Sequence, residues 1–208
     1  MEVSLFGSGA SVIIGIDEVG RGAMAGPVMV GVCAITPAIT DFPVGLRDSK
    51  MLSAPKREKL APVLLDWAPT AVGAASASEI DELGITACLG LAAKRALIAL
   101  HEVGVPVGES VVLLDGAHDW LNPALTSKLR VVTRVKADQD CAVVAAASVV
   151  AKVQRDALMV ALDVDFPAYG WASNKGYGAA IHMDAIRTVG VTVHHRQTWV
   201  KTPTERTE

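Results

Sequence analysis

The chain has 208 residues and a formal net charge of −3, with 51% hydrophobic, 20% charged and only 4% aromatic residues. This length can bury one substantial core without disulfides or a structural metal, and the composition suits a helix-rich α/β domain packed by aliphatic side chains. No apolar run reaches the roughly 18–20 residues that span a bilayer and the N-terminus lacks a signal-peptide pattern, so membrane and secreted classes are excluded and a cytoplasmic location is expected.

The N-terminal part predicts strands. Residues 12–16 and 28–35 are apolar runs rich in β-branched side chains, and a glycine-rich stretch joins them. This short connection favours an antiparallel pair. The first run stops at Asp17-Glu18, as a buried strand stops at an active edge of a sheet. Residues 70–78 alternate small and apolar side chains and indicate a third strand.

The rest of the chain predicts two long helices and two more strands. Residues 86–101 place apolar side chains at helical spacing, with Thr86 as the expected N-cap, and the Ala-rich residues 142–162 predict a second long helix. Residues 110–114 and 131–135 are further apolar runs. Strands followed by helices in this order indicate an α/β fold with a mixed sheet flanked by helices.

Acidic residues follow three of these strands. Mg²⁺ and Mn²⁺ prefer carboxylate and water oxygens, and two such ions about 3.5–4 Å apart can activate water and stabilise a leaving oxygen at a phosphodiester. Each acid also has a structural explanation, since Asp115-Gly116 is a common turn and Asp138 could cap a helix. The candidates are Asp17, Glu18, Asp115 and Asp138.

The positions of Asp17 and Glu18 conflict with a simple shared role. Adjacent residues of a regular strand point to opposite faces. For both to act on one ligand, either the strand distorts here or Glu18 contributes through its backbone carbonyl.

The Gly20-Arg21-Gly22 turn that follows has backbone that can approach a ligand closely and a guanidinium that can bind phosphate. It lacks the glycine spacing of a dinucleotide fingerprint or a P-loop.

The charges and cysteines are less specific. The slight net acidity argues against a nucleic-acid partner, although a whole-chain sum does not describe a local surface. One basic stretch alternates with acids and predicts either a nucleic-acid-binding strip or a solvated mixed face. The basic residues are Lys128, Arg130, Arg134, Lys136, Lys152 and Arg155.

The three scattered cysteines are typical of buried thiols in a reducing compartment. The cysteines are Cys33, Cys88 and Cys141.

An ordered series of motifs resembles the type II ribonuclease H family. The series runs from Gly15 to Trp199, almost the whole chain. Three positions differ from residues common in the family, namely Ala23-Met24, Gly84 and Gln197-Thr198-Trp199. The matching motifs are Gly15 to Gly22 (GIDEVGRG), Asp48-Ser49-Lys50, Glu79 to Leu83, Leu114-Asp115-Gly116, Lys136 to Asp156, Asn174 to Gly178, His182 and His195-Arg196.

The resemblance implies an RNase H-like fold, a mixed five-stranded sheet flanked by helices. It implies a single catalytic domain over residues 1–208, with a small helical C-terminal extension at about residues 163–200 packed on it. Residues 201–208 are polar and are expected to be a flexible tail.

The resemblance also implies roles for individual residues. The four acids would be both the catalytic residues and the ligands of two Mn²⁺ or Mg²⁺ ions. Gly20, Arg21 and Gly22, with Tyr177, would sense the ribose 2′-hydroxyl, the one group that marks RNA locally against DNA. Lys50 and Lys175 would bind backbone phosphates. His182 and His195 are expected to be buried hydrogen-bonding residues outside the catalytic set.

The activity implied is that of a monomeric endonuclease. It would hydrolyse the RNA strand of RNA/DNA hybrids and incise duplex DNA 5′ of single embedded ribonucleotides, leaving a 3′-hydroxyl and a 5′-phosphate. Two alternatives are another RNase H-fold nuclease and a non-catalytic hybrid-binding protein. The loop Gly20-Arg21-Gly22 with Tyr177 disfavours the first, and the complete set of carboxylates disfavours the second.

Overall fold

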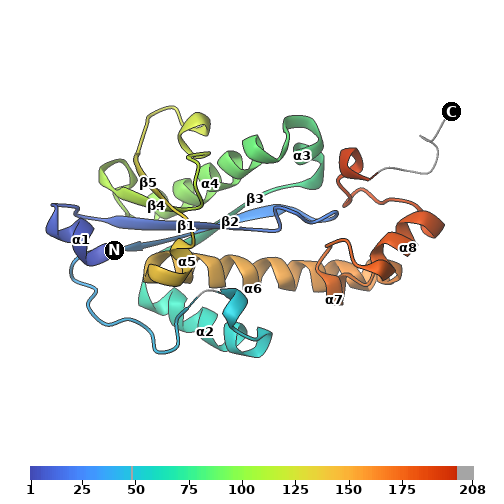
Figure 1. The fold of residues 1–208 in the computed structure, drawn as a ribbon, viewed down its shortest axis with the longest axis horizontal. Coiled ribbons are helices and arrows are strands. Elements are labelled where there is room, and N and C mark those ends of the chain that lie inside the picture. Colours follow the sequence, from blue (N-terminus) through green and yellow to red (C-terminus); the bar gives the residue numbers. More distant parts are fainter. Residues whose placement is uncertain (48, 201–208) are drawn as a thin grey trace.

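A mixed five-stranded sheet forms the centre of the computed structural model, which describes residues 1–47 and 49–200 (Figure 1). The strand order is β3-β2-β1-β4-β5; β1 pairs antiparallel with β2, β2 antiparallel with β3, and β1, β4 and β5 run parallel. The expected fold class and the antiparallel first pair are confirmed. The strands are β1 (Ile13–Val19), β2 (Val28–Ile35), β3 (Thr70–Ala75), β4 (Val111–Asp115) and β5 (Arg130–Arg134).

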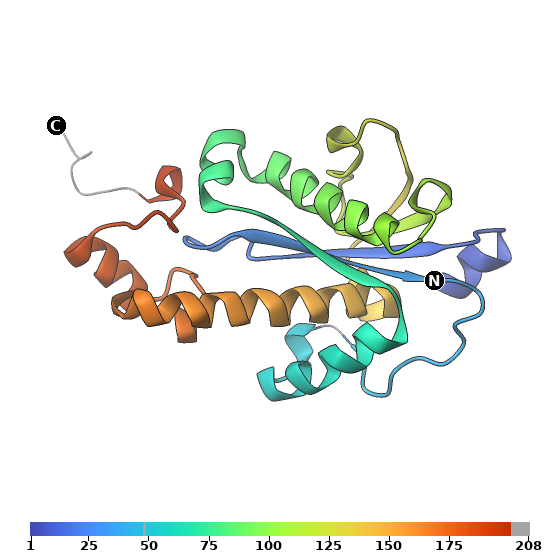
Figure 2. The same cartoon turned by 180° about the vertical axis from the view of Figure 1, so that it is seen from behind.

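Helices cover both faces of the sheet (Figures 1 and 2). On one face α4 (Ile85–Glu102) packs against β2 and β3, in a core cluster that includes Leu89 and Ile14, and on the other α6 (Ala142–Asp165) packs against β1 and β2, in a cluster that includes Val143 and Ile13. Because both faces are buried, β1 and β2 are nearly continuous apolar runs. The other elements before α6 are α1 (Glu2–Gly7), η1 (Ser49–Met51), α2 (Ala54–Trp67), α3 (Ala77–Leu83), η2 (Val107–Glu109), η3 (Asn122–Ala124) and α5 (Ala137–Asp140), where η denotes a 3-10 helix.

Helix α6 lies unusually close to the sheet. A Cβ atom on Gly31 would lie 2.2 Å from the carbonyl oxygen of Ala147, and one on Gly15 would lie 2.4 Å from the carbonyl carbon of Val143. Only glycine on the strands, facing small residues on the helix, permits such contact. This approach brings Ser148, the residue after Ala147, beside the carboxyl end of β1.

The C-terminal region after α6 packs around a hydrophobic cluster of its own at one end of the molecule (Figure 1). Trp171 and Met159 are fully buried in this cluster. The division into a catalytic domain and an extension from about residue 163 stays a prediction, and the expected tail, residues 201–208, lies outside the described residues. The elements are η4 (Pro167–Tyr169), α7 (Trp171–Asn174), α8 (Ala180–Val189) and η5 (Gln197–Trp199).

Three predicted boundaries are wrong. The first strand does not stop at Asp17-Glu18 but continues through both acids to Val19. The third strand ends at Ala75, because Ser76 is instead the N-cap of α3, in a reciprocal capping box with Glu79. Helix α4 begins at Ile85 after Gly84, so Thr86 lies inside the helix and does not cap it.

The three cysteines are buried free thiols, as expected. Within the described ranges, no helix is long and apolar enough to cross a membrane.

Candidate active site

The carboxyl ends of three parallel strands meet at one edge of the sheet. Ile16 of β1 pairs with Leu114 of β4, so Asp17 and Asp115 follow at the same level on neighbouring strands. Asp115 in turn pairs with Arg134, the last residue of β5. The sheet register therefore places the first and third candidate acids side by side at this edge.

The fourth acid, Asp138, joins this edge through the turn after β5. Lys136 adopts a left-handed conformation with φ of 60°, and the backbone N–H of Ala137 then donates to Asp115 Oδ1 at 2.8 Å. Asp138 itself is only 2% exposed, and its Oδ2 lies 3.5 Å from Lys50 Nζ. It lies in α5, whereas the N-cap of α6 is Cys141, so Asp138 does not cap that helix.

Strand β1 remains regular through both of its acids. Asp17 pairs with Gly31 and Glu18 with Val30, so the distortion considered as one alternative does not occur. Both residues nevertheless line a cavity of about 410 Å³ at the strand end. A contribution of the Glu18 backbone carbonyl stays a prediction.

The carboxylates destabilise one another's ionised forms. Burial raises the pKa of Asp17 to about 7; a hydrogen bond with Ser148 opposes this increase, and the negative charges of Glu18 and Asp115 add to it. Burial likewise raises the pKa of Glu18, which Arg21 opposes from 3.3 Å. Additional positive charge would therefore favour the ionised forms of Asp17 and Glu18.

A hard divalent cation fits this donor set. No group of three or more acidic, histidine or cysteine side chains in residues 1–47 and 49–200 forms a compact, preformed metal site. The carboxylate oxygens are the ligand type that Mg²⁺ and Mn²⁺ prefer, and the burial that raises the pKa of Asp17, with the nearby charges of Glu18 and Asp115, favours a cation beside it. Asp17, Glu18, Asp115 and Asp138 would hold the ions.

Most of the expected substrate-binding residues line the same cavity as Asp17. Lys50 is 75% exposed there, and Tyr177 is 38% exposed. Ser49, Ser148 and Lys152 also line it; all three lie in the matching motifs, but the sequence analysis gave none of them a role in the site. The hydroxyl oxygens of Ser49 and Ser148 are 2.8 Å apart. The expected residues in this cavity are Asp17, Glu18, Gly20, Arg21, Gly22, Lys50 and Tyr177.

Lys175 lies elsewhere. It lines a separate cavity of about 470 Å³ formed by residues of α2 and α6, and its ammonium group donates to the carbonyl of Ala172. A phosphate contact from Lys175 stays a prediction, but the structure does not bring this side chain into the cavity of the carboxylates. Asp48, beside Ser49 in the motif, lies outside the described residues.

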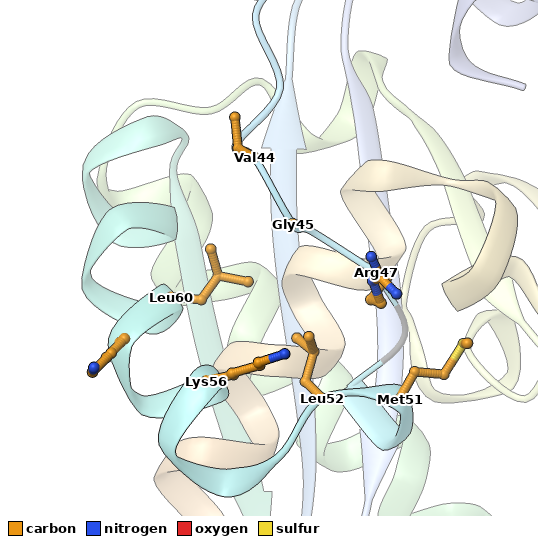
Figure 3. A pocket seen from close by; sticks show the side chains of 8 residues that line it. Val44, Gly45, Arg47, Met51, Leu52, Lys56 and Leu60 are labelled. Carbon is orange, nitrogen blue, oxygen red and sulfur yellow. The ribbon is translucent and has the colours of Figure 1, made fainter.

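A third cavity, of about 360 Å³, lies between α2 and the segment that leads into it (Figure 3). Figure 3 shows Arg47 and Lys56 beside Leu52, between α2 and the segment that leads into it. Three cationic side chains and no acidic one line this cavity, which we call the basic cavity. It is lined by Val44, Gly45, Arg47, Met51, Leu52, Lys56, Lys59 and Leu60.

The basic stretch suggested by the sequence is not one continuous surface. Arg155 is completely buried, Arg134 pairs with Asp140, and Lys152 pairs with Asp156 at 2.6 Å. The interpretation as a strip for nucleic acid is therefore wrong for Arg155, because its guanidinium lies inside the protein.

The two histidines are structural, as expected. His182 Nδ1 donates to the carbonyl of Tyr177 at 2.8 Å, and His182 Nε2 lies 3.1 Å from His195 Nε2. Burial lowers the pKa of both residues, that of His195 to about 4. Both are therefore neutral near physiological pH and serve the packing of the C-terminal region.

A family model described as Ribonuclease HII matches residues 14–202. The chain belongs to this family. The ribonuclease HII of Streptomyces coelicolor is 48% identical over 193 residues, covering 92% of this chain and 78% of that protein. The ribonuclease HII of Cereibacter sphaeroides strain ATCC 17025 is 41% identical over 198 residues, covering 95% and 88%. The chain is thus an RNase H nuclease, a hydrolase whose family acts on RNA/DNA hybrids.

Solved structures share the fold. The ribonuclease H2 of Pyrococcus horikoshii OT3 superposes with a TM-score of 0.70 at 27% identity, covering 90% of this chain and 93% of that one. A structure of Bst-RNase HIII in complex with Mn²⁺ has a TM-score of 0.69 at 26% identity, covering 88% and 64%. The RNase HII of Archaeoglobus fulgidus in its PCNA complex also has a TM-score of 0.69, at 26% identity and covering 94% and 97%.

The two glycines of the Gly20-Arg21-Gly22 loop provide a matched test. Gly20 has φ of +80° and a Cβ there would lie 2.1 Å from Arg155 Nε, whereas a Cβ on Gly22 would meet no atom within 4 Å. We expect Gly20→Ala to lower the melting temperature by several degrees, since strain and overpacking typically cost about 1–3 kcal/mol. Gly22→Ala should leave the melting temperature unchanged and reduce only cleavage, by obstructing the substrate. Equal melting temperatures for both variants, measured by calorimetry, would contradict this assignment.

The raised pKa of Asp17 predicts that Asp17→Asn stabilises the fold by an amount that depends on pH. A carboxyl whose folded pKa lies above its unfolded value stabilises the fold fully below the unfolded value of 3.8 and loses this contribution as pH rises through about 7. In chelator at about pH 8, the asparagine variant should have a melting temperature higher by roughly 2–4 °C, equivalent to about 1 kcal/mol for a chain of this length. The gain should shrink steadily toward about pH 4. Asp66→Asn, at an exposed position of α2, serves as control; a gain independent of pH would refute the assignment.

Proposed function

We propose that this ribonuclease HII incises duplex DNA 5′ of single embedded ribonucleotides and also cuts the RNA strand of hybrids, leaving a 3′-hydroxyl and a 5′-phosphate. One observation carries the proposal: Asp17 and Glu18 line the same cavity as Gly20, Arg21, Gly22 and Tyr177. A scissile phosphate at the acids would thus have its neighbouring ribose beside the loop. The 2′-hydroxyl is the group that distinguishes that ribose from deoxyribose.

In the proposed mechanism the carboxylates are metal ligands. Two Mn²⁺ or Mg²⁺ ions, when bound, would activate water and stabilise the leaving oxygen. Asp17, Asp115 and Asp138 would hold them with Glu18, and the charge of the ions would offset the burial and the neighbouring negative charges that raise the pKa of Asp17. The Mn²⁺ complex of the related Bst-RNase HIII supports a divalent ion at this fold.

Cationic and hydroxyl side chains around the cavity would position the substrate. Arg21 pairs with Glu18, and Lys50 pairs with Asp138. Once metal ions neutralise the acids, these two cationic side chains would be able to bind phosphate oxygens instead. Tyr177 presents its exposed ring at the same cavity and would contact the ribose. These contacts position the duplex without reading its base sequence.

Asp115→Asn tests the metal-dependent reaction. The amide side chain keeps an oxygen that can accept from Ala137 N–H, so the turn after β5 should persist while the negative charge is lost. We expect cleavage to fall by at least about 100-fold while hybrid binding survives, because a neutral amide holds divalent cations poorly. The assay is a gel comparing a duplex containing one ribonucleotide with an all-DNA duplex, with and without chelator.

A matched control for this assay is Asp119→Asn, a carboxylate in the segment after β4 that accepts from Leu121 and Asn122 backbone N–H groups. Its cleavage rate should equal that of the wild type. Unchanged turnover of Asp115→Asn would remove the proposed metal site. Cleavage of long hybrids with no incision at a single ribonucleotide would restrict the function to hybrids.

The basic cavity predicts contacts to a duplex arm outside the active site. Each lost phosphate contact should reduce the slope of log affinity against log salt by about 0.9 on B-form DNA. Replacing Arg47, Lys56 and Lys59 by alanine should therefore flatten the slope in a fluorescence binding titration, with little effect on cleavage at saturating substrate. Lys94→Ala on α4, across the sheet from α2, should not change it. An unaltered slope in the triple variant would show that DNA does not reach this cavity.

A further inference from the structure

Two arginines are buried beneath the Gly20-Arg21-Gly22 loop. Arg155 and Arg196 both have 0% exposure, and burial lowers the pKa of each, that of Arg196 to about 10. Within the described chain neither forms an ion pair with a carboxylate; their partners are backbone carbonyls. A buried charge is costly unless its donors are satisfied, so this arrangement calls for a specific explanation.

Arg196 binds the loop itself. Its Nη2 donates to the carbonyl of Gly20 at 2.6 Å, and its Nη1 donates to the carbonyl of Arg21 at 2.8 Å. Nε and Nη2 also donate to the carbonyl of Gly26, at 3.3 and 3.2 Å. The guanidinium carbon lies 4.8 Å from the ring centre of Trp199, which fixes the plane of the group.

These contacts orient the other side of each peptide unit. In a planar trans peptide, the carbonyl and the following N–H point in opposite directions. When the carbonyls of Gly20 and Arg21 point to Arg196, the N–H groups of Arg21 and Gly22 point away from it. Neither N–H has a partner within the described chain. Gly22 faces open space, so the loop offers two oriented, unused donors at the cavity.

Arg155 ties residues 25–27, which follow the Gly20-Arg21-Gly22 loop in the same connection between β1 and β2, to the segment that carries Tyr177. It donates to the carbonyl of Pro27 at 2.9 Å, to that of Ala25 at 3.1 Å and to that of Lys175 at 2.9 Å. Its guanidinium carbon also lies 5.5 Å from the ring centre of Tyr177. One side chain therefore fixes the distance between the two elements that would hold the ribose.

We propose that Arg155 and Arg196 are positioning residues that determine selectivity for ribose over deoxyribose. Together they hold the N–H groups of the Gly20-Arg21-Gly22 loop and the Tyr177 hydroxyl in one fixed arrangement around the 2′-hydroxyl. The planar fork of arginine can fix several carbonyls at once, which a lysine cannot do. The inference rests on the proposed function, since it assumes that this loop contacts the ribose.

A surface residue provides an independent means of loosening Arg196. Asp81 on α3 accepts from the backbone N–H groups of Gln197 and Thr198 at 2.8 and 3.0 Å, and from the Thr198 hydroxyl at 2.5 Å. It thereby fastens η5, which directly follows Arg196, to the body of the protein. Asp81 does not line the cavity of Asp17 and Glu18, so its replacement acts on the loop from a distance, by releasing η5 and by removing a negative charge that interacts with Arg196.

The test uses Arg155→Lys, Arg196→Lys and Asp81→Ala in one assay. For each, kcat/KM is measured on a duplex with one ribonucleotide, and an all-DNA duplex serves as competitive inhibitor under the same metal conditions. We expect the lysine variants to lower the ratio of kcat/KM to inhibitor affinity by about tenfold or more, which is about 1.4 kcal/mol. The inhibition constant of the all-DNA duplex should stay constant. Asp81→Ala should show a smaller loss in the same direction.

Glu79→Ala is the matched control, because Glu79 lies on the same short helix and binds Ser76 and Arg95 but not η5. It should leave the ratio unchanged. The inference is overturned if the lysine variants keep the wild-type ratio. It is also overturned if kcat/KM and the affinity for the all-DNA duplex fall together, as in a general loss of structure. If the lysine variants do not fold, Asp81→Ala decides the test, and a wild-type ratio in that variant overturns the inference. A wild-type enzyme without preference for the ribonucleotide would instead refute the proposed function.

Discussion

The burial of acidic side chains close to one another, at the carboxyl ends of β1, β4 and β5, is the constraint on which the site depends. Asp17 is 3% exposed, and burial beside Glu18 and Asp115 raises its pKa to about 7. Such a cluster is unfavourable unless positive charge offsets it. In the described structure Arg21 and Lys50 supply part of that charge from exposed side chains. This arrangement supports the proposal that divalent ions and phosphate replace these cationic side chains when substrate binds.

Helix α6 connects the core to this site and to the C-terminal region. Its first half packs against Gly15 and Gly31, where no side chain would fit. One turn later Ser148 and Lys152 line the cavity, and Arg155 then reaches the loop between β1 and β2. A single rigid helix thus sets the position of the acids relative to the loop and Tyr177, at the precision that catalysis requires.

The sequence could predict the parts whose signals are local. Apolar runs that stop at acidic residues located β1 and β4, and the fold class followed from the ordered motifs. Helix α2 escaped notice because Pro62 lies inside it and its apolar periodicity is weak. The Ser76 and Glu79 spacing was a readable capping signal that would have separated β3 from α3. The burial of Arg155 could not be predicted, because its partners lie 20 to 130 residues away in the chain.

Calorimetric titration with Mn²⁺ tests most directly whether the four acids form one metal site. Because Asp17 has a pKa of about 7 without metal, binding should release protons at about pH 6.5 and release fewer at about pH 8.5, as buffers of different ionisation enthalpy would reveal. The account predicts that replacing Asp17, Asp115 or Asp138 by asparagine abolishes this binding. Mn²⁺ binding of wild-type strength and stoichiometry in all three variants would contradict it.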